Sequence, residues 1–466
     1  MKYFANTTHK KRRPLGKEGI LLVYVLIFGG VITIMIASGL TSYALFEHRA
    51  SRHVENRDIA FHIAEAGIDY YRWHLAHSPN DYQDGTGEAG PYVHDFEDKD
   101  GNVIGQFSLD ITPPDEWGSV VTIRSTGYTT ERPDITRTVQ VRLGYPSIAN
   151  FALLSNTSMI FSPTTYVSGG VMSNVGIEFN GTTNAPVQSA NETYNTPSSG
   201  VQPGVWGSGG PSAFFDFPVP AQDFGAISVD LAAIQQGAID NGLHLGISNY
   251  YGWMLDFQSN GTIDIYEVSS ECAIYTYWYT WDYNDVCGTT TWSPLQTVTM
   301  PANGLIFSDD KLWVRGNVSG RVTIAAGRFP ESPSTYQSVI IMDNLAAVNP
   351  NGGDVVGIIA QGNIIVPYYV PDTMTINAAA ISQFGSLSRP PYVDPWWCSC
   401  GNNQLRSTLN FSGAQISYSG GGWKYGNPVI TGFVTTNHTY DNNLRLNPPP
   451  GFPVGTTYEI LSWEEL

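Results

Sequence analysis

Residues 19–46 read GILLVYVLIFGGVITIMIASGLTSYALF and contain no Asp, Glu, Lys, Arg or His. A helix of that length spans roughly 40 Å at about 1.5 Å per residue, more than the roughly 30 Å hydrocarbon core of a bilayer. Cations flanking an inserted helix tend to stay on the cytoplasmic side. Those preceding this stretch are Lys10, Lys11, Arg12, Arg13 and Lys17. We expect a membrane-crossing helix with the rest of the chain facing outward; the alternative is an ordinary cleaved secretory signal.

The chain changes sharply in charge at this stretch. The first 18 residues hold six Lys or Arg and one acid, whereas the remainder holds 17 basic and 40 acidic residues. An acidic outward part repels phosphate backbones, so we expect no nucleic-acid partner. Charged residues make up only 14% of the chain, and Gly, Ser, Thr, Asn and Tyr are abundant, which is typical of an extracellular β-rich protein.

The helical pattern continues beyond the apolar stretch. Val54, Phe61, Ile68 and Leu75 recur every seven residues and give the helix one apolar stripe. The Ser-Pro-Asn that follows ends the helix, because proline cannot donate the required hydrogen bond. We expect one helix over residues 20–78, first buried in a membrane and then packed against a domain.

Three runs of alternating apolar and polar residues come next, at 103–112, 119–128 and 136–143. Such alternation predicts half-buried strands, and the three runs together predict a small antiparallel sheet within residues 79–146. A sheet with one apolar face needs a cover. The stripe of the preceding helix is the nearest candidate.

These features carry a resemblance to a known family. A basic leader, a glycine directly before a long apolar helix, and the phrase IAFHIAEAGI at 59–68 resemble type IV prepilins, and PilX-like minor pilins and pilus-assembly proteins in particular. The resemblance covers about residues 10–77. It implies a cytoplasmic leader at residues 1–19, cleavage between Gly19 and Ile20 by a prepilin peptidase, and association with other pilins and the pilus assembly machinery.

One position departs from the prepilin pattern. Most pilins carry a glutamate five residues after the cut, where its carboxylate can neutralise the new amino terminus of a neighbouring subunit; here that position is Tyr24. An unpaired charge inside a membrane is costly. The departure favours a tip, initiator or anchored subunit over one that repeats along the pilus shaft.

From residue 147 onward the pattern changes to short strands interrupted by Gly, Asn and Ser. Many short strands with Asn-Gly turns suit either a β-solenoid or a β-sandwich. Near-continuous apolar runs such as DVVGIIA at 354–360 favour the solenoid, because they predict burial on both faces. One helix is expected over residues 228–241, with Ser228 as its N-cap and Gly242 after its end.

Several phrases of this outer part resemble the right-handed parallel β-helix region attached to PilX-like prepilins. They are VMSN at 171–174, IEFNG at 177–181, GRVTIAA at 320–326, GIIAQGNI at 357–364, NPPP at 447–450 and YEILSW at 458–463. The resemblance implies a β-solenoid outer domain over residues 147–466, and an α+β fold class for the whole chain. It supplies no molecular activity.

Four cysteines lie outside the apolar stretch. Cys272 and Cys287 are 15 residues apart around a loop, while Cys398 and Cys400 form Cys-Ser-Cys. Zinc modules use other spacings, so we expect disulfides and no metal site. The pair Cys272 and Cys287 is preferred; a bridge within Cys-Ser-Cys would close a strained ring, and its pairing stays open.

The loop between the expected disulfide partners, residues 272–287, is the most unusual local feature. It is crowded with aromatic side chains: Tyr275, Tyr277, Trp278, Tyr279, Trp281 and Tyr283. Exposed Tyr and Trp clusters are typical of recognition surfaces, because their rings bury large areas at little entropic cost. We take this loop as the candidate ligand-binding site, for a surface glycan or a protein. The alternative is a hairpin whose alternate residues pack on the solenoid.

No motif indicates catalysis. We find neither a Gly-x-Ser-x-Gly elbow nor a phosphate-binding glycine loop, and we expect no catalytic residue, metal or cofactor. Parallel β-helices do host polysaccharide lyases, which need carboxylates for calcium and a basic residue on one face. Candidates for such a site are Asp309, Asp310, Lys311 and Arg315. Charged turns between coils are the alternative.

The leading hypothesis is a non-enzymatic cell-surface minor pilin or pilus-associated adhesin. It would be a single-pass protein of a bacterial envelope, with an extracellular β-helix for attachment and with incorporation into a pilus as an option. The rival from another class is a membrane-anchored polysaccharide-active enzyme. A third hypothesis is a structural envelope protein that never enters a pilus.

Overall fold

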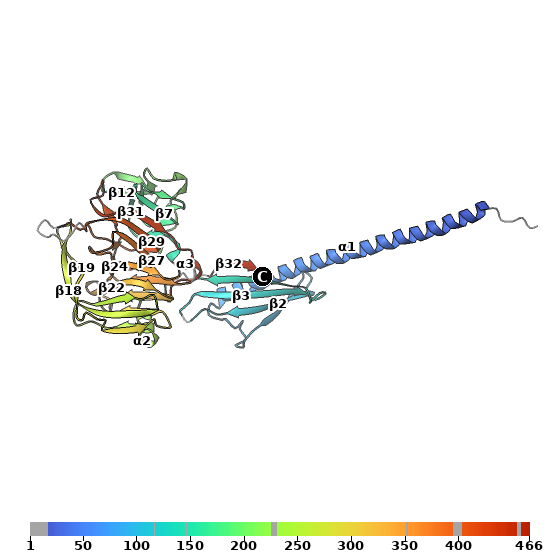
Figure 1. Cartoon of the computed structure of the whole chain (residues 1–466), viewed down its shortest axis with the longest axis horizontal. Coiled ribbons are helices and arrows are strands. Elements are labelled where there is room, and N and C mark those ends of the chain that lie inside the picture. Colours follow the sequence, from blue (N-terminus) through green and yellow to red (C-terminus); the bar gives the residue numbers. More distant parts are fainter. Residues whose placement is uncertain are drawn as a thin grey trace, which may run out of the picture.

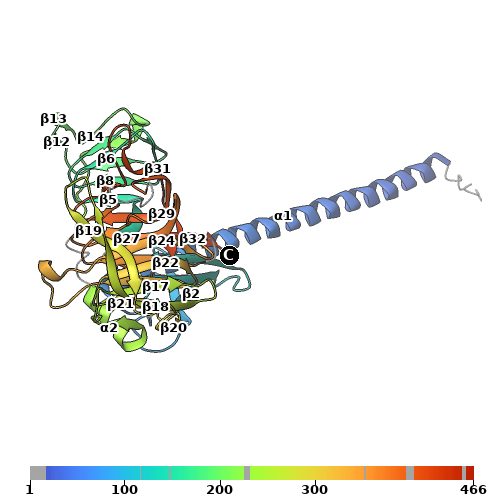
Figure 2. The same cartoon turned by 60° about the vertical axis from the view of Figure 1, so that its left-hand side comes forward.

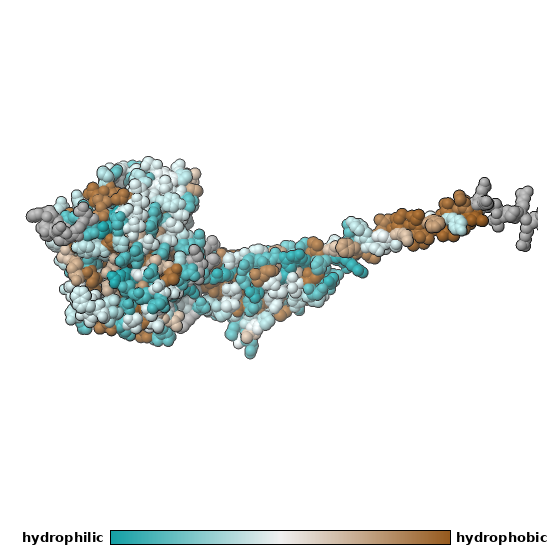
Figure 3. Space-filling view, viewed as in Figure 1, coloured by the Kyte–Doolittle hydropathy of each residue, from teal (hydrophilic) through white to brown (hydrophobic). Residues whose placement is uncertain are grey.

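The computed structural model describes residues 17–115, 117–145, 148–224, 231–350, 353–394, 403–453 and 458–466. It consists of one long helix, α1 (Lys17–His77), followed by a mostly β structure. Figure 1 shows α1 projecting from the β structure as a rod. The outer half of the rod carries the apolar stretch and is largely brown in Figure 3. From Ile20 onward the helix is long and apolar enough to cross a membrane.

The C-terminal half of α1 covers a small antiparallel sheet. Its strands, in spatial order, are β1 (Tyr92–Glu97), β2 (Val103–Thr112), β3 (Val120–Thr129), β4 (Thr136–Gly144) and β32 (Glu459–Glu465). Ile63, Tyr71 and Leu75 of the helix are fully buried in one cluster with Val121 and Val141 of the sheet. The three expected strands are therefore present to within a residue or two, and the helix is their cover.

The helix buries a slightly different stripe from the one expected. Ile68 and Leu75 are buried, but Phe61 is only half-buried and Val54 is 57% exposed. A strict seven-residue spacing drifts around a straight helix of 3.6 residues per turn. Ala60 is fully buried in place of those more N-terminal stripe positions.

α1 approaches β3 so closely that one strand position has no room for a side chain. A Cβ atom added to Gly127 would overlap the backbone atoms of Ala60 and Ala64. Beside this contact, the hydroxyl of Thr129 donates a 2.8 Å hydrogen bond to Asn56 Oδ1 of the helix. Glycine therefore sets how deeply the helix is seated on the sheet.

Two strands of this sheet were not expected. β1 lies in a stretch that looks polar, and it forms a hairpin with β2. The last strand, β32, pairs with β4 through Trp463 opposite Val141, and the Trp463 ring lies 6.0 Å from the Phe61 ring of α1. The expected outer domain of residues 147–466 is therefore wrong at its end. The outer region is an insertion between two neighbouring strands, β4 and β32.

In the outer region, strands far apart along the chain pair in parallel ladders. The first ladder contains, in spatial order, β16 (Leu243–Leu245), β21 (Leu305–Ser308), β23 (Arg321–Ala326), β25 (Val355–Ala360), β27 (Thr373–Ser382), β29 (Leu405–Ser417), β5 (Leu153–Ser155), β8 (Val171–Ser173), β11 (Val187–Ser189) and β15 (Phe215–Asp216). A second contains β17 (Trp253–Phe257), β22 (Leu312–Val318), β24 (Val339–Ala347), β26 (Ile364–Ile365) and β28 (Leu387–Ser388). A third adds β31 (Thr431–Thr439), β7 (Thr165–Ser168) and β10 (Thr182–Thr183) to the N-terminal parts of β27 and β29.

The spatial order of the first ladder differs from the chain order. The chain enters at β5 in the middle, runs to β15 at one end, and resumes at β16 at the opposite end before returning to β29 beside β5. Figure 2 shows this stack upright, with helix α2 (Leu231–Asn241) at the bottom and the hairpin of β12 (Thr193–Thr196) and β13 (Gly200–Pro203) at the top. The segment from β5 to β15 therefore forms one part of the stack, and the segment from β16 to β29 forms the other part and ends beside β5.

Both faces of the first ladder are buried. Paired neighbours such as Ile306, Ile324 and Ile358 belong to one apolar cluster. The adjacent row, with Phe307 and Ile359, belongs to another. This arrangement accounts for the near-continuous apolar runs, as expected.

Helix α2 (Leu231–Asn241) covers the apolar cluster that contains Phe307 and Ile359, and it contributes Leu231 and Ile234. The helix ends where Gly242 N donates to Ala238 O at 3.1 Å, as the sequence predicts. The expected N-cap Ser228 lies outside the described residues.

The remaining elements are short or peripheral. They are η1 (Ile148–Asn150), β6 (Met159–Phe161), β9 (Ile177–Phe179), β14 (Val205–Trp206), η2 (Ser212–Phe214), β18 (Thr262–Tyr275), β19 (Trp281–Thr289), β20 (Gln296–Thr299), η4 (Pro333–Thr335), β30 (Lys424–Tyr425) and α3 (Asn443–Leu446).

We expect a buried histidine to make the stack sensitive to acid. His438 on β31 is buried, and its Nδ1 lies 2.8 Å from Gln415 Nε2. Burial, with a smaller effect from Lys424, lowers its pKa from 6.5 to about 3. In the unfolded chain the imidazole binds a proton below its ordinary pKa of about 6.5, whereas in the folded chain it stays neutral down to about pH 3. The stability that the neutral imidazole contributes is therefore present above about pH 6.5 and is lost as the pH falls towards 3.

We predict that the wild type loses more stability between pH 7 and pH 5 than His438→Asn does. The measurement is the unfolding midpoint in denaturant at both pH values. Parallel losses in the two proteins would contradict the assignment.

Candidate recognition surface

A hairpin arm, formed by β18 and β19 (residues 262–289), lies across the second ladder. The first part of β18 pairs with β17, where Ile265 faces Leu255, and on its other edge with β20. Beyond that point, its partner among the described strands is β19. A disulfide joins Cys272 to Cys287 across the arm, as predicted. Cys398 and Cys400 lie outside the described residues, so their pairing stays a prediction.

The inner face of the arm packs on the stack. Val268 and Val286 contact the outward side chains Trp313, Ile340 and Ile365 of the second ladder. The Trp313 side chain is fully buried and donates a 2.7 Å hydrogen bond from Nε1 to the Asn284 carbonyl oxygen. The alternative, a hairpin whose alternate residues pack on the strands beneath it, is therefore right for this face of the arm.

The tip of the arm, residues 275–281 (YTYWYTW), presents its aromatic side chains outward. Tyr277, Trp278 and Trp281 are 50–59% exposed, and Tyr279 is 81% exposed. The half-buried Tyr275 ring lies 5.1 Å from the Trp281 ring, and the Trp278 ring lies 6.0 Å from the Tyr425 ring of β30. The structure thus brings five of the six aromatic residues of the loop together on one tip, whereas the exposed Tyr283 lies farther along β19. Their role in binding stays a prediction.

The tip is fixed to the stack by backbone contacts. Tyr277 N donates to Pro391 O at 2.7 Å, and Val393 N donates to Tyr275 O at 3.0 Å. The hydroxyls of Thr276 and Thr280 lie 2.9 Å apart and close the turn. The arm is therefore held at its base, along its inner face and at its tip.

Buried polar groups fill the space between tip and stack. Asp285 accepts hydrogen bonds from the backbone N–H groups of Tyr368 (3.0 Å) and Tyr369 (2.8 Å), and burial raises its pKa to about 6. Asp282 accepts a 2.8 Å hydrogen bond from the Tyr392 hydroxyl, and burial raises its pKa as well. These carboxylates hold the arm.

Arg389 lies fully buried among the same groups. It donates to the carbonyl oxygens of Asn403 (2.6 Å) and Tyr368 (3.2 Å), and burial lowers its pKa to about 10. Its ring neighbours are Tyr392 and Phe433, 5.2 and 5.6 Å from the guanidinium carbon. The sequence offered no local signal for this cluster, because Asp282 and Tyr392 are 110 residues apart.

The charged residues considered for a lyase site hold neighbouring segments together. His244 Nε2 lies 3.0 Å from Asp309, and Asp310 accepts a 2.9 Å hydrogen bond from the hydroxyl of Ser248. The Lys311 ammonium donates to Glu271 at 2.5 Å and Arg315 pairs with Asp256 at 2.7 Å. Among the described residues there is no group of three or more His, Cys, Asp or Glu side chains that could hold a metal ion.

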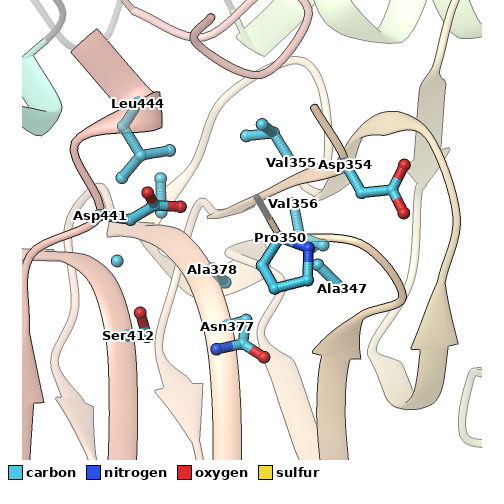
Figure 4. Close-up of a pocket in the computed structure, with 12 residues that line it drawn as sticks. Ala347, Pro350, Asp354, Val355, Val356, Asn377, Ala378, Ser412, Asp441 and Leu444 are labelled. Atoms are coloured by element: carbon cyan, nitrogen blue, oxygen red, sulfur yellow. The ribbon is translucent and has the colours of Figure 1, made fainter. Parts of the chain in front are cut away.

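A cavity of about 180 Å³ lies where the first and third ladders meet, beside α3 (Figure 4). Its lining is mostly Ala, Val, Pro and Leu, with two carboxylates. Asp354 accepts hydrogen bonds from the backbone N–H groups of Gly320 and Asn349, both at 2.8 Å. Asp441 accepts one from Asn443 N at 2.9 Å. Both acids thus fix turns of the chain.

The residues expected at the cleavage site lie on α1. Gly19 falls within the helix, while Ile20 and Tyr24 are 52% and 58% exposed on the projecting rod. Cleavage itself stays a prediction.

No protein-family model matches the chain. No curated protein matches it either. Among solved structures, the competence-associated pilin ComZ from Thermus thermophilus aligns with 88% of this chain and 97% of its own, at 14% sequence identity and a TM-score of 0.31. Similarity at this level transfers neither the fold nor the activity of that protein to this chain.

Proposed function

We propose that this protein is a non-enzymatic minor pilin or pilus-associated adhesin, displayed on a bacterial cell surface. One observation carries the proposal: a single 61-residue helix is exposed and apolar over its N-terminal half, and its C-terminal half packs on the apolar face of a small antiparallel sheet. The exposed, apolar N-terminal half suits a bilayer or the apolar interior of a helical assembly. The sheet and the insertion between β4 and β32 then face outward.

The finer identity rests on the sequence resemblance to PilX-like prepilins. In that account a prepilin peptidase cuts between Gly19 and Ile20, and the partners are other pilins and the assembly machinery. The basic leader stays in the cytoplasm, which orients the chain with its C-terminal part outside.

For the outer region we propose a right-handed parallel β-helix. Parallel pairing of β21, β23, β25, β27 and β29 in succession supports stacked coils, and parallel crossover connections are almost always right-handed. An experimental structure with left-handed coils or two face-packed sheets would contradict this.

Tyr24 provides a test of the subunit's place in a pilus. We predict that Tyr24→Glu raises the fraction of this protein found in sheared pili, because the new carboxylate can pair with a neighbouring amino terminus. Tyr24→Gln is the uncharged control and should behave like the wild type. Equal gains in both variants would show that charge is not the cause.

The arm tip provides a test of attachment. We predict that cells carrying Trp278→Ala attach to their natural surface several-fold less than wild-type cells. Trp292→Ala removes an equally large exposed ring from the loop that follows the arm and should leave attachment unchanged. Unchanged attachment in Trp278→Ala, with the protein still displayed, would refute an adhesive role for the tip.

A further inference from the structure

The tip of the arm has an unusual chemistry for a protein surface. Residues 275–281 consist of five aromatic residues and two threonines, with no charged residue and no aliphatic one. Every side chain at the tip therefore offers a ring face, a hydroxyl or an indole N–H. Such a surface can stack against an apolar face and satisfy hydroxyl groups around its edge.

One residue at the tip is held in an unfavourable backbone conformation. Tyr279 has φ of 60°, in the left-handed region that non-glycine residues rarely adopt. Its side chain is 81% exposed, so this conformation gains little packing within the chain. This conformation closes the turn of the arm, where Tyr279 N donates to Thr276 O at 3.0 Å. Glycine would adopt it at lower cost, so the presence of an exposed aromatic residue there points to a function for the ring outside the chain.

The tip is also rigid before it meets a ligand. The disulfide, the two backbone hydrogen bonds to Pro391 and Val393, and the bridge between Thr276 and Tyr392 hold it on the stack. A rigid surface loses little conformational entropy on binding. Weak individual contacts can then add up to useful affinity.

The charges around the tip disfavour anionic ligands. Two carboxylates, Asp282 and Asp285, lie directly beneath it, and the positive charge of Arg389 is buried and directed at carbonyl oxygens. Lys311 is engaged with Glu271 and with the Tyr283 carbonyl oxygen. Acidic glycans, nucleic acids and anionic membranes would approach a negative field.

We propose that the tip binds an uncharged polysaccharide. The C–H faces of its pyranose rings would stack on Trp278, Tyr279 and Trp281, and its hydroxyls would bond to the tyrosine and threonine hydroxyls. This assignment rests on the proposed attachment function and adds the ligand class. An uncharged lipid surface fits less well, because inserting the tip would bury these hydroxyls without partners.

The test uses the full chain in detergent and affinity electrophoresis in gels containing dextran, mannan or a mixed-linkage β-glucan. Alginate and hyaluronate are the acidic arms, and zwitterionic phosphatidylcholine vesicles are the lipid arm in a separate flotation assay. We expect retardation by at least one neutral polysaccharide, and little change between about 0.05 and about 0.5 M salt, because no ion pair is involved.

The key variant is Tyr279→Gly. Glycine adopts positive φ readily, so the unfolding midpoint of the variant should be no lower than that of the wild type. The variant should nevertheless lose most of the retardation that the neutral polysaccharide causes. Trp278→Ala should lose retardation at least tenfold, and Trp292→Ala should keep it. Retardation that survives in Tyr279→Gly and Trp278→Ala would overturn the proposal.

Other outcomes are equally decisive. Stronger retardation by alginate or hyaluronate, or flotation with vesicles alone, would overturn the assignment of an uncharged polysaccharide. Loss of cell attachment in Trp278→Ala without retardation in any polysaccharide would overturn the ligand class and leave the attachment function, with a protein partner in its place. Unchanged cell attachment in that variant would instead refute the proposed function.

Discussion

Replacement of Trp313 by alanine should destabilise the outer region by about 3–5 kcal/mol, the usual cost of truncating a buried tryptophan. Its side chain is fully buried between the second ladder and the arm, in one cluster with Val268 and Ile340. Its Nε1 satisfies the Asn284 carbonyl oxygen at 2.7 Å, and the Lys311 ammonium lies 5.3 Å from its ring. Truncation would therefore leave a cavity and an unpaired carbonyl beneath the arm.

Denaturant unfolding followed by intrinsic fluorescence measures this effect, with limited proteolysis of the arm as a local readout. Trp292→Ala is the matched control, since the same side chain is removed from a site where it is fully exposed. We expect its unfolding midpoint to stay at the wild-type value. A loss in Trp313→Ala no larger than in the control would mean that the arm does not depend on this contact.

Gly127→Val should dislodge α1 from the small sheet. A Cβ atom at this position overlaps backbone atoms of Ala60 and Ala64, and backbone cannot move aside as a flexible side chain can. Overpacking costs about 1–3 kcal/mol in ordinary cores, and we expect the upper end of that range here. Helix and sheet should separate before the outer region unfolds.

Protease sensitivity of the chain between α1 and β1, together with the first unfolding transition, reports this separation. Gly246→Val is the matched control, because nothing lies within 4 Å of a Cβ atom there. A wild-type transition in Gly127→Val would contradict the close seating of the helix on β3.

The parts of the fold that the sequence predicts are those set by local periodicity. The strands at 103–112 and 136–143 alternate cleanly, and the apolar stretch at 19–46 has the length and composition of a bilayer span. The disulfide between Cys272 and Cys287 follows from two cysteines around one loop. Each of these needs information from only a few neighbouring residues.

Features that depend on distant partners could not be predicted in this way. β32 completes the small sheet only because the chain returns to β4 after the whole outer region, and Trp463 meets Phe61 there. β5 lies beside β29 although more than two hundred residues separate them. Local alternation is the same whichever strand becomes the partner.

The candidate site shows the same division. The aromatic run at residues 275–281 is visible in the sequence, but which of its rings face outward depends on the register of β19 and on contacts with Pro391 and Val393. The buried group of Asp285 and Arg389 draws residues from separate segments. The sequence shows that the tip carries no charge, but only the folded chain shows that Tyr279 has a positive φ and that the nearby Arg389 and Lys311 are engaged with other groups.

The most direct test of the central claim is mass spectrometry of the amino terminus of the protein purified from its own cells. The prepilin account predicts a chain that begins at Ile20 with a methylated amino group, because the peptidase removes residues 1–19 and modifies the new terminus. A chain that still begins at Met1, or at a site beyond the apolar stretch, would contradict it.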